Sequence, residues 1–367
     1  MARGSERRSK AVSASAKKAA KPAPEPRKTA KVKRVPAPAP VPAPAPAPVP
    51  VLSKGGGGGS GERRPRVALL LKRSAWGIYL EDRKDPRLHR LHAAGDPAVA
   101  RLRASHTEHE RTVKEVKEAL TTLGVDWTIV PRSPEGFDAS PFDLVVTVGG
   151  DGTLLSASHS VIDRPILGIN SAPSFSVGFF CGAKSGHVID ALRRALAGRL
   201  KRTLLTRMKV SINGKVVAAR VLNDALFCHA SPAATSRYVL RLRDIEEEQK
   251  SSGFWMGPAA GSTAAQRSAG GRVLPLTSRR LQLVVREPYT PQGEKYRLGH
   301  ALIESDEVLG VLCKMHDARI FFDGPDNVVD LGFGDVVEFT QADQALVLLG
   351  ISSERKGAER KRRARRR

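Results

Sequence analysis

The chain has few cysteines, no long hydrophobic run and no Walker A sequence. Its three cysteines, Cys181, Cys228 and Cys313, are more than 40 residues apart, so they form neither a disulfide framework nor a CxxC metal pair. The longest apolar runs, such as Val67–Leu71 and Ala345–Leu349, are far shorter than the roughly 18–20 residues that a membrane span needs. Since free thiols suit a reducing compartment, we expect a cytoplasmic protein without a membrane partner. The missing GxxxxGK[ST] sequence excludes a P-loop.

Positive charge is concentrated at the two ends of the chain. The formal net charge is +24 over 367 residues. Residues 1–66 hold 16 Lys and Arg against three Glu, and residues 354–367 hold nine against two, so these ends carry 20 of the 24 charges. The composition therefore describes a mildly basic globular body with two cationic tails rather than one large nucleic-acid-binding domain. The length predicts roughly two domains.

The two ends are predicted to be disordered. Pro alternates with Ala or Val over residues 36–50, and residues 55–59 are all Gly. Such segments bury too little apolar area to offset the entropy lost on ordering. We expect residues 1–65 and 351–367 to be basic, disordered tails that bind polyanions weakly. A targeting role for residues 1–30 is the alternative.

The body begins as an alternation of strands and helices. Apolar residues three and four positions apart predict helices over His106–Leu123 and Gly186–Leu200. Because fully apolar strands that alternate with helices indicate a parallel sheet covered on both faces, we expect a doubly wound, mostly parallel α/β domain over residues 66–200. The apolar runs of strand length are Val67–Leu71, Val125–Val130, Asp143–Val148 and Pro165–Ile169.

From residue 204 the pattern changes to strands without helices between them. Met208–Ile212 and Val216–Leu222 flank Asn213-Gly214, the dipeptide typical of a type I′ hairpin turn. Such a pattern predicts a mostly antiparallel, β-sandwich-like domain over residues 201–350. Further strands are expected at Tyr238–Leu242, Leu281–Val285, Ile320–Phe322 and Val336–Phe339.

A glycine-rich turn, Gly149-Gly150-Asp151-Gly152-Thr153, follows the strand at 143–148. Glycines at the carboxyl end of a strand let backbone N–H groups approach a ligand, and the start of a following helix favours an anion. Asp151 adds nothing to phosphate binding, but a carboxylate here can accept the proton of a hydroxyl during phosphoryl transfer. A tight turn in which Asp151 caps a helix is the alternative.

Two further segments have compositions that suit a ligand site. Leu222–Ala225 places Asn223 beside Asp224 at the end of a strand, where they either contact a ribose or base edge or close a plain turn. Ser251–Gly271 consists largely of small residues, which suit a loop against which a flat ligand lies. A flexible linker is the alternative, although Phe254, Trp255 and Met256 argue against it.

Together the three segments resemble the NAD kinase family, whose members are relatives of the diacylglycerol kinases. The pattern is GGDGT, an Asn–acid pair, and GSTAxxxSAGG about 110 residues after the Asp. The resemblance covers about residues 67–350. The chain is similar above all to the plant NADH-kinase branch and its bacterial relatives, because of the segments LNDALFCHASP at 222–232 and LQLVVREP at 281–288.

The resemblance implies a two-domain enzyme that transfers the γ-phosphate of ATP, with Mg²⁺, to the 2′-hydroxyl of the adenosine ribose of NAD or NADH, making NADP(H). It also implies a homo-oligomer, either a dimer or a tetramer. Asp151 is implied as the base. The phosphate-binding residues are implied to be Gly149, Gly150, Gly152 and Thr153, and the dinucleotide-binding residues to be Asp151, Gly152, Asn223, Asp224, Thr263, Ala264 and Ser268. Metal ligands are not predicted.

Two positions depart from the pattern that many family members share. Ala265 stands where many have a stacking Tyr, and Ser252 stands where many have Asp. A carboxylate near the nicotinamide ring attracts the positively charged oxidised ring and not the reduced one. We therefore expect NADH to be used at least as well as NAD.

Two other classes of function remain as alternatives. A related GGDGT lipid kinase would share the first segment but should have a membrane-binding face close to the body. A polyanion-binding protein would explain the basic tails through counterion release, but none of the three segments.

Overall fold

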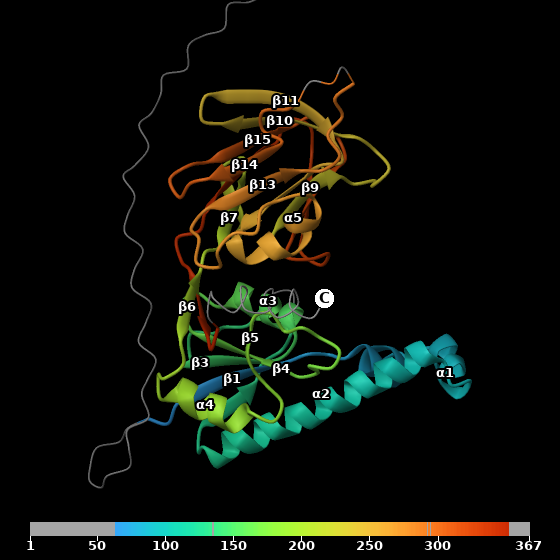
Figure 1. Ribbon diagram of the computed structural model, residues 1–367, viewed down its shortest axis with the longest axis vertical. Helices are drawn as coiled ribbons and strands as arrows, with labels where there is room; N and C mark the ends of the chain where they lie inside the picture. The colour runs from blue at the N-terminus through green and yellow to red at the C-terminus, as the bar shows by residue number, and fades with distance from the viewer. Residues whose placement is uncertain (1–62, 134–135, 292, 294, 352–367) are drawn as a thin grey trace, which may run out of the picture. The chain divides into compact units, whose positions relative to one another are not determined.

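The computed structural model describes residues 63–133, 136–291, 293 and 295–351 (Figure 1). The predicted tails at 1–65 and 351–367 lie almost entirely outside these residues. None of the described helices is long and apolar enough to cross a membrane.

The first part of the fold is a seven-stranded sheet in the order β2-β1-β3-β4-β19-β6, with β5 paired to β4. All its pairings are parallel except that of β19 with β6. Every residue of β3 and β4 is buried, as a sheet covered on both faces requires. The strands are β1 (Arg66–Leu71), β2 (Asp126–Ile129), β3 (Leu144–Gly149), β4 (Ile166–Asn170), β5 (Cys181–Lys184), β6 (Arg202–Leu205) and β19 (Leu346–Leu349).

Helices cover both faces of this sheet (Figure 1). In β1, Val67 and Leu69 pack with apolar side chains of α2 and α4, whereas Ala68 and Leu70 pack with those of α3. The predicted doubly wound, mostly parallel α/β arrangement is therefore confirmed. The helices are η1 (Gly77–Asp82, a π-helix), α1 (Pro86–Ala93), α2 (Pro97–Thr122), α3 (Asp151–Ser160) and α4 (Val188–Leu196).

Helix α2 begins at Pro97 rather than at the predicted His106. Asp96 caps it, because its carboxylate accepts hydrogen bonds from Ala98 N at 2.8 Å and Val99 N at 3.4 Å. Between Val99 and His109 no residue of α2 is buried. The first turns therefore lack the apolar period by which a sequence reveals a helix.

The second part of the fold is a pair of six-stranded antiparallel sheets, in the orders β11-β10-β15-β18-β7-β8 and β14-β13-β12-β9-β16-β17. The predicted hairpin forms β7 and β8. The strands of the first sheet are β7 (Met208–Ile212), β8 (Lys215–Val221), β10 (Ser236–Leu242), β11 (Ile245–Ser251), β15 (Leu309–Cys313) and β18 (Val336–Gln341). Those of the second are β9 (Ala225–His229), β12 (Phe254–Pro258), β13 (Leu281–Val285), β14 (His300–Ile303), β16 (Ala318–Phe322) and β17 (Val328–Leu331).

Aromatic side chains join the two antiparallel sheets. Phe254 of β12 lies 5.0 Å from Phe227 of β9, ring centroid to centroid, on one sheet. It also lies 5.2 Å from Tyr238 of β10 and 5.9 Å from Phe339 of β18 on the other sheet. Both sheets contribute to one buried cluster, so the predicted β-sandwich is confirmed.

The chain leaves the first sheet and returns to it at the end. Strand β6 begins at Arg202, and β19 follows the last strand of the sandwich, yet the two pair with each other in the first sheet. A division into residues 66–200 and 201–350 therefore assigns both strands to the range of the sandwich. An apolar run such as Leu346–Leu349 fits either sheet by its pattern, so the sequence could not show its partners.

Candidate active site

Asp151 is the first residue of α3 and directly follows β3 and Gly150. Its half-buried carboxylate accepts two backbone hydrogen bonds, from Phe179 N at 2.9 Å and from Phe180 N at 2.7 Å. Each carboxylate oxygen takes one of these bonds, so each keeps a further lone pair. The side chain is thus held in one orientation without being used up as an acceptor.

The glycines around Asp151 differ in the space around them. A Cβ on Gly149 would lie 2.2 Å from Thr153 Oγ1, and one on Gly150 would lie 2.8 Å from Ser176 Oγ. Packing against Thr153 and Lys72 therefore excludes a side chain at Gly149, whereas a side chain at Gly150 would require the hydroxyl of Ser176 to move. Gly152 is exposed, and an added Cβ there would meet nothing within 4 Å. Its backbone is open to an approaching molecule, as a phosphate-binding turn requires.

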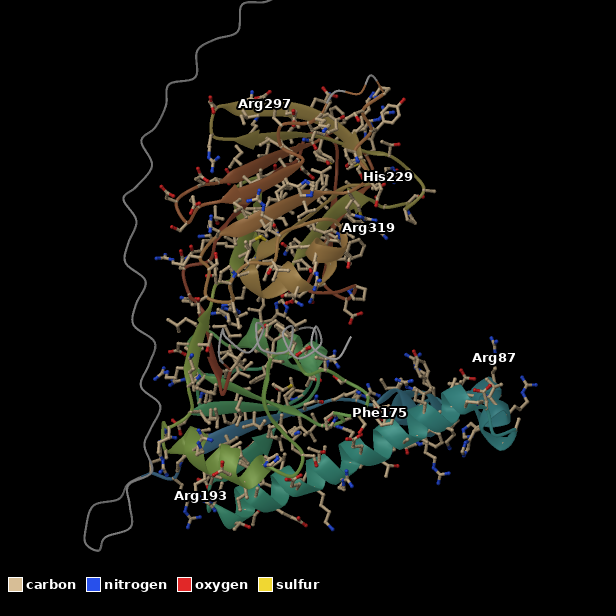
Figure 2. All side chains as sticks on the ribbon, viewed as in Figure 1. Arg87, Phe175, Arg193, His229, Arg297 and Arg319 are labelled. Carbon is tan, nitrogen blue, oxygen red and sulfur yellow. The ribbon has the colours of Figure 1, made fainter. Side chains whose placement is uncertain are left out.

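The segment that holds Asp151 is itself fixed to β3 and to α2. Ser171 N donates to Gly149 O at 3.0 Å, and Ser174 Oγ donates to Glu108 of α2 at 3.3 Å. Phe175 lies close to α2 (Figure 2). The guanidinium of Arg101 on that helix lies over its ring, 5.8 Å from the centroid. The loop between β4 and β5 is therefore anchored at both ends of its path.

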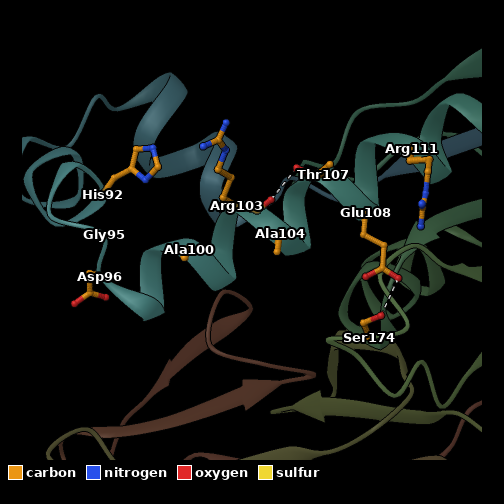
Figure 3. A pocket seen from close by; sticks show the side chains of 10 residues that line it. All are labelled: His92, Gly95, Asp96, Ala100, Arg103, Ala104, Thr107, Glu108, Arg111 and Ser174. Atoms are coloured by element: carbon orange, nitrogen blue, oxygen red, sulfur yellow. Dashed lines mark hydrogen bonds between the residues drawn. The ribbon is translucent and has the colours of Figure 1, made fainter.

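A cavity of about 620 Å³ lies between α2 and this loop (Figure 3). The hydrogen-bonded pair Glu108 and Ser174 lines the cavity. On the side of α2, the lining includes the short side chains of Ala100, Ala104 and Thr107. No residue predicted from the sequence as part of the site lines it.

The Asn223–Asp224 turn is built around a carboxylate that the sequence analysis did not single out. Asp323 accepts hydrogen bonds from Leu222 N at 2.8 Å, Asn223 N at 2.6 Å and Asp224 N at 3.1 Å. Its own N–H donates to Asp224 O at 2.9 Å, and its side chain is fully buried. The only signal for it in the sequence was the Asp323-Gly324 turn after a strand.

Burial first, and then the charge of neighbouring Asp323, together raise the pKa of Asp224 to about 7. Two carboxylates in one buried site cannot both ionise cheaply. The carboxyl group of Asp224 is therefore close to half-protonated at neutral pH. Beside it, the buried Oδ1 atom of Asn223 has no hydrogen-bond partner among the described residues.

The small-residue segment packs directly on the backbone of Asn223. A Cβ on Gly261 would lie 1.8 Å from Asn223 O, and one on Gly257 would lie 2.3 Å from it. Gln266 Nε2 donates to the same oxygen at 3.2 Å, and Gln282 Nε2 donates to Gln266 Oε1 at 2.9 Å. The segment is ordered as η2 (Ala259–Thr263) and α5 (Ala265–Ser268), not as a flexible linker.

The structure brings the second and third predicted segments into contact and places the first beside a different part of the fold. In the part of the site formed by the second and third segments, Thr263 is half-buried and Ala264 and Ser268 are exposed. Helix α3 connects the groups, because it begins at Asp151 and, near its end, places His159 Nε2 3.1 Å from Asp323 Oδ2.

Comparisons with known proteins identify the family. A family model described as the ATP-NAD kinase N-terminal domain matches residues 62–200. A probable NADH kinase of Oryza sativa is 33% identical over 254 residues, which are 63% of this chain and 78% of that relative. The chain belongs to the NAD kinase family. The NADH kinase of Arabidopsis thaliana is also 33% identical, over 63% of this chain and 80% of its own length.

Solved structures of NAD kinase family members share the fold. An NAD kinase from Archaeoglobus fulgidus in complex with ATP has a TM-score of 0.56 and 22% identity, over 77% of this chain and 92% of that one. Yeast NADH kinase complexed with NADH has a TM-score of 0.55 and 14% identity, over 80% of this chain and 85% of that one. These two structures support the fold, and the 33% identical plant relatives confirm the family resemblance drawn from the three segments.

Proposed function

We propose that the protein phosphorylates NADH and NAD at the 2′-hydroxyl of the adenosine ribose, with ATP as donor, and so makes NADPH and NADP. The observation that carries this proposal is the placement of Asp151. This chain belongs to the NAD kinase family, and its Asp151 lies at the start of α3 beside the exposed backbone of Gly152. The N–H groups of Phe179 and Phe180 fix the orientation of its carboxylate.

Asp151 has the position of a base for this reaction. The free lone pair of its carboxylate accepts the proton of the 2′-hydroxyl while the ribose oxygen forms its bond to the γ-phosphorus. The bond between that phosphorus and the β,γ-bridging oxygen breaks, and ADP leaves. Because phosphoryl transfer depends on positioning and charge stabilisation, a covalent intermediate on the protein is not required. We propose that the open backbone at Gly152 and the first N–H groups of α3 bind the phosphates.

The dinucleotide is proposed to lie against Asn223, Asp224, Thr263, Ala264 and Ser268. Support comes from the unpartnered Oδ1 of Asn223, which can accept a hydrogen bond from a ribose hydroxyl or base amino group. The exposed rim formed by Ala264 and Ser268 leaves backbone accessible to a flat ring. Yeast NADH kinase was solved with NADH and the Archaeoglobus fulgidus enzyme with ATP, which supports the same pair of substrates here.

Three further parts of the proposal concern the metal, the assembly and the compartment. The described residues contain no group of three or more His, Cys, Asp or Glu placed to hold a metal ion. We therefore assign Mg²⁺ to the phosphates of ATP, since Mg²⁺ is usually held by few carboxylates and by substrate oxygens. A homo-oligomer is proposed from the family membership. Cytoplasmic location is proposed because Cys228 and Cys313 are free thiols.

The test is a coupled assay of the purified protein with NAD and with NADH, each in the presence of ATP or inorganic polyphosphate. We expect 2′-phosphorylated product with ATP from both dinucleotides, with NADH used at least as well as NAD. Formation of no product from either dinucleotide, with a lipid or another alcohol phosphorylated instead, would overturn the proposal.

A further inference from the structure

Two cationic residues stand at the sheet edge that carries the glycine-rich turn. Lys72 follows β1 directly, and β1 is the neighbour of β3, which ends at Gly149. Arg132 follows β2, which pairs with the other side of β1. Lys72 N donates to Val148 O at 2.9 Å, and the Cβ of Lys72 would lie only 3.0 Å from a Cβ on Gly149. The carboxyl ends of parallel strands are where open α/β sheets bind their ligands.

The charge of Lys72 is not offset within the described part of the chain. Partial burial lowers the pKa of its ammonium group, and the charge of Arg132 lowers it further, while no described carboxylate opposes either effect. Charges that are taken out of water are ordinarily paired. Lys72 lies beside the glycine-rich turn and within electrostatic reach of Arg132, so it is a cationic group that a bound anion would stabilise.

Two buried polar side chains near this sheet edge also have an atom without a partner among the residues that the structure describes: His109 lies close to Lys72, and the backbone N–H of Ser171 donates to Gly149 O. His109 of α2 is 2% exposed and Ser171 is 1% exposed, and within the described residues neither His109 Nδ1 nor Ser171 Oγ has a hydrogen-bond partner. Burial lowers the pKa of His109, and the nearby charge of Lys72 lowers it too. Unsatisfied buried polar atoms are rare in proteins and call for an explanation. Here both belong to residues close to the end of β1 or of β3.

We infer that Lys72, assisted by Arg132, binds the triphosphate of the donor beside the turn at Gly149–Thr153. This inference rests on the proposed function for the identity of the donor. It assigns Lys72 the role of a donor-binding residue. Its ammonium group offsets negative charge on the phosphate chain, while Asp151 accepts the proton of the acceptor hydroxyl. The diphosphate of the dinucleotide is the other source of the same chemistry, and the experiment separates the two.

The experiment compares the wild type with Lys72→Met, which keeps the length of the side chain, and with Lys72→Arg, which keeps the charge. Lys114→Met is the matched control, because Lys114 is 78% exposed on α2. Binding of ATP and of inorganic tripolyphosphate is measured by calorimetry without dinucleotide, and KM is then measured separately for ATP and NADH. Melting temperatures show that each variant is folded.

We expect Lys72→Met to weaken ATP and tripolyphosphate binding by about ten- to a hundredfold, the usual effect of losing a charge-assisted hydrogen bond. The KM for NADH should change less than about threefold, and Lys72→Arg should retain most of the affinity. Unchanged ATP affinity in a folded Lys72→Met variant, or an equal rise in the KM for NADH, overturns the inference. If the wild type phosphorylates neither dinucleotide, but its tripolyphosphate affinity still depends on Lys72, the proposed function fails and the anion site stands.

Discussion

At the scale of single residues, Asp151 combines two properties that are usually separate. Its carboxylate is fixed by the N–H groups of Phe179 and Phe180, yet the residue is only half-buried and beside open backbone. Asp151→Asn replaces one acceptor oxygen by an amide that faces a backbone donor. We expect turnover to fall by about 10²–10⁴-fold, the range for loss of a general base, with stability lower by only about 1 kcal/mol.

The measurement is kcat for NADH phosphorylation together with ATP affinity and melting temperature. Asp190→Asn is the control, because Asp190 is 63% exposed on α4, where it forms an ion pair with Arg194 of the same helix. If Asp151→Asn binds ATP normally and turns over within a few-fold of the wild type, the carboxylate is not the base.

Asp224 makes stability depend on pH in the direction opposite to most acidic residues. Its pKa is raised from the ordinary 3.8 to about 7 in the folded protein, so between these values the folded state holds more protons than the unfolded state. Its contribution therefore favours folding least at high pH, and stability falls as the pH rises from about 4 to 7. Asp224→Asn, which resembles the protonated form, should remove this loss.

Urea unfolding at pH 5 and pH 8 tests the expectation. The variant should gain stability relative to the wild type on going from pH 5 to pH 8. Asp330→Asn serves as the control, because Asp330 is 81% exposed and should show little such gain. If the difference in unfolding free energy between Asp224→Asn and the wild type is the same at pH 5 and pH 8, then Asp224 is ionised at both pH values.

At the scale of elements, Asp323 in the turn after β16 shapes the loop that ends β8. It accepts three backbone hydrogen bonds from residues 222–224 and faces His159 of α3. Asp323→Asn keeps one acceptor oxygen, so buried backbone donors lose partners at about 1–3 kcal/mol each. We expect the KM for NADH to rise at least about tenfold, because Asn223 and Asp224 lose their position, while the KM for ATP changes little.

Steady-state kinetics with each substrate varied in turn test this expectation. Asp326→Asn is the matched control, because Asp326 is an exposed residue of the same turn. His159→Gln should have a smaller effect in the same direction, since it removes one contact to Asp323 and no backbone hydrogen bond. Equal rises in both KM values for Asp323→Asn would indicate a general loss of structure rather than a role in the dinucleotide loop.

The elements show where sequence reasoning succeeded and where it could not. Strands β1, β3 and β4 were predictable because burial on both faces makes them continuous apolar runs. The three candidate segments were visible because close backbone approach demands small residues, as at Gly149 and Gly261. Asp323 and Lys72 were missed, because their significance lies in which strands become neighbours, and a single charged residue after a strand carries no such information.

At the scale of the whole molecule, the end of the chain completes the sheet with which the fold begins. Strand β19 follows the entire sandwich, yet it lies between β4 and β6 in the first sheet. Its side chains enter both clusters of the α/β part, with Val347 and Leu349 on the face of α2 and α4 and Leu346 and Leu348 on the face of α3. The α/β part therefore cannot complete its sheet and its two apolar clusters without the last strand of the fold.

This connection predicts that a short deletion at the end is far more damaging than its length suggests. Leu346, Val347, Leu348 and Leu349 are each at most 2% exposed. At about 1.5–3 kcal/mol for each buried side chain, they contribute about 6–12 kcal/mol, which is comparable to the total stability of about 5–15 kcal/mol of a typical domain. Deleting residues 345–367 should abolish the cooperative unfolding transition and ATP binding, whereas deleting only residues 354–367 should leave both nearly unchanged. Scanning calorimetry of the two truncated chains and of the full chain measures these transitions. If the chain without residues 345–367 still shows a cooperative transition for a folded sandwich, the two parts fold independently.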